Sequence, residues 1–146
     1  MANKLKILVV DDNIHDMNMI EEALQGGKIL HELYKAFDGN QAIDLLHGNP
    51  PYKQATFPDL ILLDLNLPGT SGLEVLEAIK SDPDLHRIPV VVLAASSDQE
   101  DIHRAYDLHA NGYVTKPVNT DQFFEMIKGL KEFWLSVVLL PKQARK

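Results

Sequence analysis

The chain contains three short apolar runs, at residues 6–10 (KILVV), 60–63 (LILL) and 90–93 (VVVL). Nearly continuous runs of this length are typical of strands covered on both faces, as in a parallel sheet. Two weaker runs of the same kind lie near residues 33–37 and 113–115. The pattern therefore predicts five short strands.

A helical pattern follows each of these runs. Apolar residues recur there at the three- and four-residue spacing that lines one face of a helix. The stripes are Met17, Ile20 and Leu24; Ala42, Leu45 and Leu46; Val75, Leu76 and Ile79; Ile102, Ala105 and Tyr106; and Phe123, Ile127, Leu130 and Trp134. Regular alternation of strand and helix predicts an α/β fold, a parallel sheet with helices on both faces, because each return to a parallel neighbour needs a crossover.

Composition fits one globular domain. The chain has 146 residues, 45% hydrophobic and 24% charged, and it contains no cysteine, which excludes disulfide scaffolds and thiolate sites. No apolar stretch approaches the roughly 20 residues that span a bilayer, so we expect a cytoplasmic protein without membrane contact. The net charge of -7 argues against nonspecific binding to nucleic acid, which needs clustered cations.

Acidic residues follow two predicted strands, and a lysine follows a third. Asp11 and Asp12 come after the first strand, Asp64 after the third, and Lys116 and Pro117 after the fifth. Ligands of open α/β sheets bind at the carboxyl ends of the strands, so these side chains should converge on one edge. Taken singly, each aspartate could be an ordinary helix cap or turn residue.

Taken together, the three acids predict a bound cation. Converging carboxylates repel one another unless a positive charge neutralises them. Mg²⁺ is the usual oxygen-liganded ion beside phosphate groups, and a lysine supplies a point charge for an incoming anion. Asp11, Asp12, Asp64 and Lys116 thus indicate a Mg²⁺-dependent phosphate site.

The segments VVDDN, LILLDLNLPGTSG and GYVTKP together resemble the receiver domain of two-component response regulators. The resemblance covers residues 4–130. It implies a flavodoxin-like, doubly wound sheet of five parallel strands in the order 2-1-3-4-5, with five helices. The chain would then be a phosphorylated switch that assists its own modification, not an enzyme acting on a free substrate.

The resemblance also implies roles for individual residues. Asp64 would accept a phosphoryl group from a histidine kinase, and Lys116 would contact the phosphoryl oxygens. The bond between Lys116 and Pro117 would be cis. The implied Mg²⁺ ligands are Asp11, Asp12, Asp64 and the backbone carbonyl of Asn66.

Ala94 departs from the family pattern, because receivers usually place Thr or Ser after the fourth strand. In the family that hydroxyl bonds the phosphoryl group, and its movement is linked to an aromatic residue that matches Tyr113. One interpretation is that Ala94 only alters lifetime or coupling. The other is that the switch works differently, through the Ser96 hydroxyl.

The end of the chain indicates a more specific relationship. Residues 131–146 extend beyond a minimal receiver as a helical extension and tail. The ending FWL-x5-P, with the segments IKSDPDLHRIPVVVL and LH-x-N-x-Y-x-TK, resembles single-domain regulators paired with phytochrome-type histidine kinases. Such regulators are often dimeric, and we expect Phe133, Trp134 and Val138 in a dimer contact; packing on the chain's own domain is the alternative.

Other functions remain open from the sequence. The main alternative is a pseudo-receiver, a constitutive interaction module that phosphorylation does not switch, for which Ala94 is the chief support. A small Mg²⁺-dependent phosphohydrolase on the same kind of fold would need a second acid for leaving-group chemistry and a cap for substrate selection, which we do not recognise in the sequence.

Overall fold

Five strands alternate with five α-helices along the chain. The computed structural model describes residues 4–25 and 31–141. The strands are β1 (Leu5–Val10), β2 (His31–Ala36), β3 (Leu60–Asp64), β4 (Val90–Ala94) and β5 (Gly112–Thr115). The helices are α1 (Ile14–Leu24), α2 (Gly39–His47), α3 (Gly72–Lys80), α4 (Gln99–Asp107) and α5 (Thr120–Glu132).

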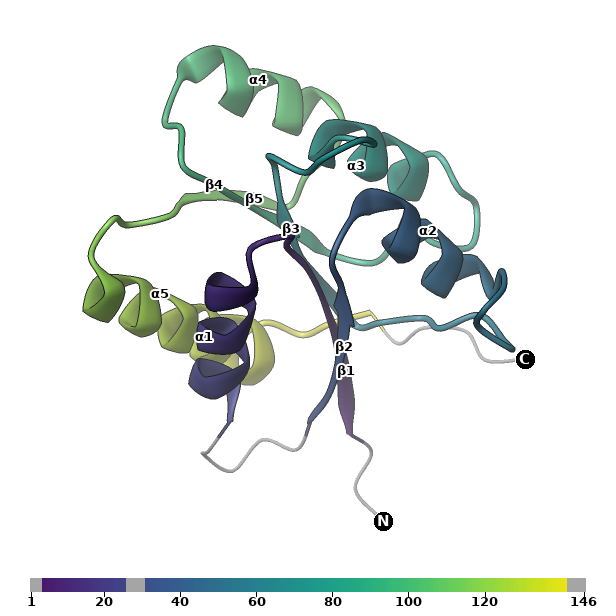
Figure 1. Cartoon of the computed structure of the whole chain (residues 1–146), viewed down its shortest axis with the longest axis horizontal. Coiled ribbons are helices and arrows are strands. Elements are labelled where there is room, and N and C mark those ends of the chain that lie inside the picture. The colour runs from purple at the N-terminus through teal and green to yellow at the C-terminus, as the bar shows by residue number, and fades with distance from the viewer. Residues whose placement is uncertain (1–3, 26–30, 142–146) are drawn as a thin grey trace.

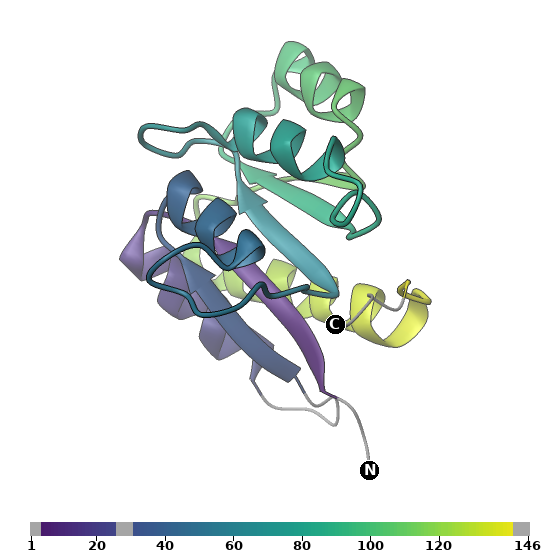
Figure 2. The ribbon, with the colours of Figure 1, turned by 90° about the vertical axis from the view of Figure 1, so that its right-hand side faces the viewer.

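All strand pairs are parallel, in the order β2-β1-β3-β4-β5. Figure 1 shows α1 and α5 on one face of the sheet and α2, α3 and α4 on the other, and Figure 2 shows the same layers from the side. The predicted α/β architecture and strand order are therefore confirmed.

Alternation along β1 divides the interior into two cores. Ile7 and Val9 join the cluster under α1 and α5, whereas Leu8 and Val10 join the cluster under α2, α3 and α4. All four are at most 1% exposed, as expected because successive strand side chains point to opposite faces. Both faces of the strand are covered, which explains why its sequence is continuously apolar.

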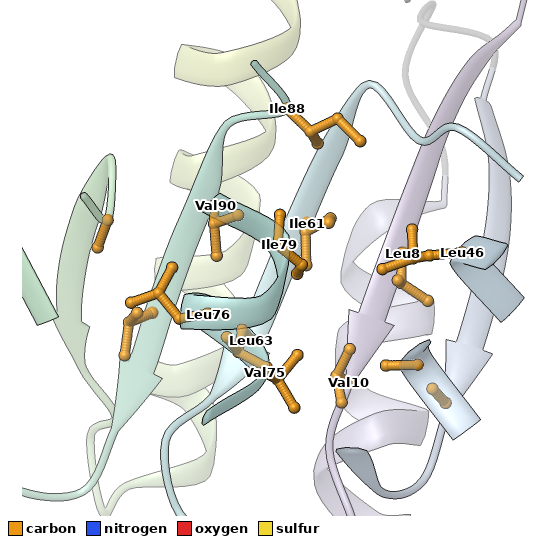
Figure 3. Packing of buried hydrophobic residues seen from close by; sticks show 14 of the residues in the cluster. Leu8, Val10, Leu46, Ile61, Leu63, Val75, Leu76, Ile79, Ile88 and Val90 are labelled. Carbon is orange, nitrogen blue, oxygen red and sulfur yellow. The ribbon is translucent and has the colours of Figure 1, made fainter. Parts of the chain in front are cut away.

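The helix α3 packs on the central strands. Figure 3 shows its residues Val75, Leu76 and Ile79 over Ile61 and Leu63 of β3. Each of these side chains is fully buried, and burial of one such side chain contributes roughly 1.5–3 kcal/mol. The strand that ends in Asp64 is consequently a firmly held support.

Each α-helix begins with a side chain that caps its free backbone N–H groups. The caps are Asn13, Asp38, Ser71, Asp98 and Asn119, each accepting a hydrogen bond from an N–H in the first turn. Ser71 and Glu74 form a reciprocal capping box. These caps fix the loops at the carboxyl edge of the sheet, where the predicted site lies.

The chain continues beyond α5 as a π-helical segment, η1 (Phe133–Val137). The Val138 N–H donates to the Phe133 carbonyl at 3.0 Å, which is the five-residue spacing of a π-turn. Residues 131 and 132 belong to α5, η1 follows them, and the predicted tail at 142–146 lies outside the described residues. None of the helices in the described part of the chain is long and apolar enough to cross a bilayer.

Candidate functional site

Three carboxylates meet at the carboxyl ends of two neighbouring strands. Asp11 and Asp12 directly follow β1, and Asp64 is the last residue of β3. One oxygen from each carboxylate lies within 4.8 Å of the other two. Because β1 and β3 are hydrogen-bonded neighbours, their ends are held together by the sheet itself. The convergence predicted from the sequence is thus present in the structure.

The carboxylate of Asp64 is held in an unfavourable environment for a negative charge. The residue is 6% exposed, and burial raises its pKa from 3.8 to about 6, with Lys116 opposing the rise and Asp11 adding to it. Asp11 is likewise buried, whereas Asp12 is exposed. The cluster therefore needs a compensating cation, since buried like charges repel strongly.

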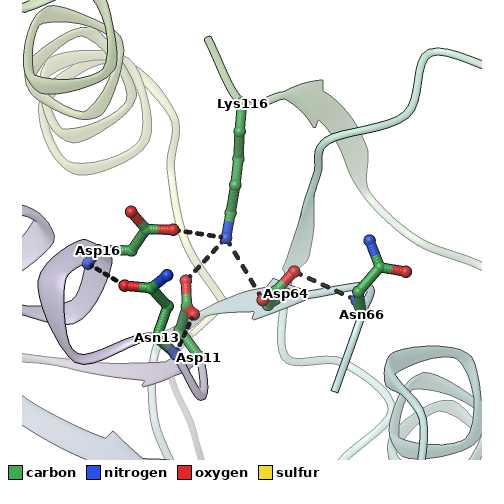
Figure 4. A network of polar contacts seen from close by, with 6 residues as sticks. All are labelled: Asp11, Asn13, Asp16, Asp64, Asn66 and Lys116. Atoms are coloured by element: carbon green, nitrogen blue, oxygen red, sulfur yellow. Dashed lines mark hydrogen bonds and ion pairs between the residues drawn. The ribbon is translucent and has the colours of Figure 1, made fainter. Parts of the chain in front are cut away.

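Lys116 supplies a positive charge at the centre of the cluster. Its Nζ lies 2.9 Å from Asp11 Oδ2, 3.2 Å from Asp16 Oδ2 and 3.3 Å from Asp64 Oδ2 (Figure 4). Burial acts to lower the pKa of Lys116, but the three carboxylates outweigh it and raise that pKa above its ordinary value. The lysine is accordingly a permanent cation here.

The backbone holds Lys116 against the end of β4. Its N–H donates to the Ala94 carbonyl at 2.6 Å. The cis bond predicted between Lys116 and Pro117 is wrong, because the one cis bond among the described residues joins Pro50 to Pro51. A trans bond is intrinsically favoured by about 0.5–1 kcal/mol before proline, and in this form the ammonium already reaches the acids.

Asp16 is a member of the cluster that the sequence analysis missed. It lies in the first turn of α1, where its N–H donates to the Asn13 side chain at 2.9 Å. A signal was available, because Asn13 is a good capping residue and an acid three positions later lies in the first turn, facing the same edge. That signal places Asp16 in the first turn of α1, but its contact with Lys116 depends on how this turn faces the end of β5.

The β3–α3 loop is tightly packed behind Asp64. The Asn66 N–H donates to Asp64 Oδ1 at 3.2 Å, and the Gly72 N–H donates to the Leu65 carbonyl at 3.1 Å. A β-carbon on Gly72 would lie 2.4 Å from the Asp64 carbonyl oxygen, which no side chain tolerates. Glycine is therefore required for the close return of the chain past the acid.

Asp12, Asp16 and Asp64 line an open depression of about 530 Å³. Asp12, Asp64, Asn66, Ala95 and Lys116 contribute to its wall. Three clustered carboxylate oxygens with open access suit a hard divalent ion that keeps several waters, so the residues fit the Mg²⁺ predicted from the sequence.

Of the three residues predicted to form the switch, Ser96 and Tyr113 are joined by a hydrogen bond. Ala94 is fully buried at the end of β4, and the Tyr113 hydroxyl donates to the Ser96 carbonyl at 2.8 Å. The Ser96 hydroxyl instead accepts from the Asp98 N–H at 3.0 Å. Ala95, rather than Ser96, lines the depression beside Asp64.

The residues expected in a dimer contact lie beyond the far end of α5. Phe133 is 50% exposed, and its ring meets that of Trp134 edge to face at 5.8 Å. Trp134 is partly buried against the core under α1 and α5, and Val138 is half-buried. The extension thus packs partly on its own domain and leaves part of its apolar surface exposed.

Comparison with known proteins agrees with this geometry. The family model of the response regulator receiver domain matches residues 7–128. Response regulator Rcp1 of Synechocystis sp. is 45% identical over 135 residues, which are 92% of each chain. The crystal structure of the phosphorylated cyanobacterial phytochrome response regulator RcpA is 49% identical with a TM-score of 0.92, covering 96% of this chain and 100% of that one. The Mn²⁺-bound form of Rcp1 is 44% identical with a TM-score of 0.91, covering 94% and 99%.

Removal of the charge at Asp64 should stabilise the metal-free protein. The pKa of Asp64 is about 6 when folded and 3.8 ordinarily, so the folded state binds more protons between these values. Its ionisation costs stability above pH 6, and this cost disappears below about pH 4. We expect Asp64→Asn to raise the free energy of unfolding by about 1–3 kcal/mol at pH 8 and by much less at pH 4.

Urea unfolding with EDTA measures this difference. Asp84→Asn is the matched control, because Asp84 is exposed and its substitution should change stability little at either pH. An equal effect of Asp64→Asn at pH 8 and pH 4 would contradict the role of its buried charge.

Proposed function

The chain belongs to the response regulator receiver family and is a phosphoacceptor module of two-component signalling, and on that premise we propose that Asp64 receives the phosphoryl group. The observation that carries the proposal is its position, nearly buried at the end of β3 with Asp11, Asp12 and Lys116 around it. The rigid strand aims the carboxylate into the open depression. Such a set favours phosphoryl acceptance over the pseudo-receiver alternative.

The transfer follows from the chemistry of a carboxylate nucleophile. An oxygen of Asp64 attacks the phosphorus of a phosphohistidine in line with the P–N bond. The P–O bond forms as the P–N bond breaks, and the departing imidazole nitrogen keeps the electron pair and takes up a proton. Lys116 donates to the phosphoryl oxygens, and the product is an acyl phosphate on the protein. No free substrate is turned over, so the chain is a switch and not an enzyme.

Mg²⁺ is the proposed cofactor, held by Asp11, Asp12, Asp64 and the Asn66 carbonyl. A bound divalent ion supplies charge neutralisation for the acids and the transferring group. The clustered carboxylates support an ion of this class, and the Mn²⁺-bound form of the relative Rcp1 agrees with it. Mg²⁺ is favoured over softer metals because every ligand is oxygen.

The proposed partner is a histidine kinase of the phytochrome type. RcpA, with which this chain shares 49% of residues, is described as a phytochrome response regulator. The similarity extends over nearly the whole of both chains, so the surfaces used for recognition fall within the compared region. We place the protein in the cytoplasm, where a two-component kinase would phosphorylate it.

We also propose a receiver domain at residues 4–130 with an extension at 131–146 that mediates a homodimer. Phe133 is half-exposed and Leu139 is 96% exposed, and both follow the last well-packed turn of α5. Exposed large apolar groups close together mark an interaction surface more often than isolated ones do. Trp134 would anchor the extension, since it is partly buried in the chain's own core.

Signal transmission is proposed to run through Ala94, Ser96 and Tyr113. The Tyr113 hydroxyl already donates to the Ser96 carbonyl. Burial, together with the negative charge of Asp101, raises the pKa of Tyr113. Ala94 carries no hydroxyl that could pull the β4–α4 loop toward a phosphoryl group. The lost charge-assisted bond is worth roughly 1.5–3 kcal/mol, so Tyr113 should be loosely coupled to phosphorylation.

Asp64 should be the sole phosphoacceptor. Incubation with acetyl phosphate and Mg²⁺, followed by intact mass and peptide mapping, should place one phosphoryl group on this residue. Asp64→Asn should abolish the labelling, and EDTA should reduce it by at least about tenfold if the metal neutralises the transferring charge. Labelling of Asp64→Asn at the wild-type rate would overturn the assignment.

The dimer contact should depend on the exposed apolar groups of the extension. Wild type should show by light scattering roughly twice the 16.4 kDa mass of one chain, and Phe133→Ala combined with Leu139→Ala should shift it toward monomer. Val118→Ala is the control, because Val118 is a fully exposed apolar residue in the β5–α5 loop, away from the extension. A wild type that stays monomeric at high concentration, with and without beryllofluoride, would exclude this contact.

Restoring a hydroxyl at position 94 should tighten the coupling. Beryllofluoride stands in for the phosphoryl group, and with Mg²⁺ it should shift the Tyr113 NMR signals more in Ala94→Thr than in wild type. Ser96→Ala should behave as wild type, since Ala95 and not Ser96 lines the depression beside Asp64. If wild type already shows a complete shift that Thr does not enlarge, Ala94 is a neutral substitution.

A further inference from the structure

We propose that Asp16 competes with the phosphoryl group for the ammonium of Lys116 and thereby weakens phosphoryl binding. It would be a positioning residue, acting through Lys116 rather than on the reacting atoms. The inference rests on the proposed function of Asp64. It concerns a residue that contributes nothing to the motifs that identify the site.

Asp16 is held in a fixed place beside the lysine. Its N–H donates to the Asn13 side chain at 2.9 Å, which sets it in the first turn of α1. From there its Oδ2 accepts from Lys116 Nζ at 3.2 Å (Figure 4). The side chains of Asp16 and Lys116 are 23% and 14% exposed, so water screens this ion pair only in part.

The ammonium has three N–H donors and three carboxylates in reach. Asp11, Asp16 and Asp64 each place an oxygen within 3.3 Å of Nζ. Asp11 and Asp16 each accept a hydrogen bond from Nζ, and Asp64 forms an ion pair with it at 3.3 Å. A phosphoryl oxygen that binds the ammonium therefore has to compete with these carboxylates for its three N–H donors.

The three carboxylates differ in whether metal binding or phosphorylation would weaken their hold on Lys116. Asp11 and Asp64 belong to the oxygen cluster that suits a metal ion, and Asp64 itself would carry the phosphoryl group. Asp16 is outside that cluster among the described residues, so neither event removes its charge. Asp16 therefore still competes for Lys116 after the metal ion and the phosphoryl group have bound.

The same charge also acts on the phosphoryl group directly. Asp16 and Asp64 contact one common nitrogen, so the group on Asp64 and the Asp16 carboxylate are close like charges. Like charges at such a separation repel appreciably at the intermediate dielectric of a protein surface. Both effects have the same sign, and both should lower the affinity of the site for an anion.

The test is the affinity for beryllofluoride at saturating Mg²⁺, measured by titration calorimetry. Asp16→Asn keeps the size of the side chain and removes its charge, and we expect binding about three- to tenfold tighter than in wild type. Asp16→Glu, which keeps the charge, should stay within about twofold of wild type. Glu22→Gln, an exposed acid on the same helix, controls for net charge and should have no effect.

A second measurement separates this role from a structural one. Removing Asp16 strengthens the positive field of Lys116, so Mg²⁺ affinity in Asp16→Asn should fall or stay unchanged while beryllofluoride affinity rises. A merely structural defect would weaken both ligands, and circular dichroism would show whether the variant is folded.

The outcomes are distinguishable from a failure of the proposed function. If wild type does not bind beryllofluoride in a manner that requires Asp64, the phosphoacceptor assignment fails. If wild type binds and Asp16→Asn binds equally or more weakly, the competition is wrong and Asp16 instead supports Lys116. An effect of Asp16→Glu as large as that of Asp16→Asn would also overturn the inference, because the charge would then be irrelevant.

Discussion

A single ammonium group balances the negative charge on which the site is built. Lys116 Nζ joins acids from the end of β1, the first turn of α1 and the end of β3, the first two of them 105 and 100 residues away along the chain. Without it, carboxylates that are largely withdrawn from water would repel one another, and the strand ends would be pushed apart. The lysine, which we propose as the contact of the phosphoryl group, therefore also holds these three elements together. Any charge added at Asp64 therefore changes the electrostatic force on the end of β1, the first turn of α1 and the end of β3, which all contact Lys116.

The apolar sheet makes this arrangement possible. Burial of the β1 and β3 side chains on both faces leaves their ends little freedom to separate. The capping residues and the Gly72 contact then fix the loops that carry the polar groups. The repulsion between carboxylates at this edge is tolerated because the hydrophobic packing of the two cores contributes much more free energy to folding.

Much of this fold could be predicted, and the exceptions have physical causes. The continuous runs of β1, β3 and β4 are unmistakable, whereas β2 begins earlier than the weak run at 33–37 because an edge strand is only partly buried. Parallel topology brings Asp11, Asp12 and Asp64 to one edge, so these acids follow from pattern alone. Asp16 does not, because its place depends on how the first turn of α1 faces Lys116 in three dimensions.

Two further differences concern features that periodicity does not encode. The cis and trans forms of the Lys116–Pro117 bond differ little in intrinsic free energy, so the surrounding residues decide which form is adopted. Apolar spacing likewise does not distinguish the end of α5 from the π-helical segment that follows, since both present apolar residues at short intervals.

The π-helical turn also determines how the chain leaves α5. The hydrogen bond from the Val138 N–H to the Phe133 carbonyl closes the turn, and Val138 itself is extended. Trp134 packs against the core under α1 and α5, while Phe133 and Leu139 are exposed. The acids lie at the carboxyl ends of the strands, near the start of α5, whereas this segment lies beyond its end. Evolution can therefore vary the exposed apolar surface of the extension without disturbing the geometry of the acids.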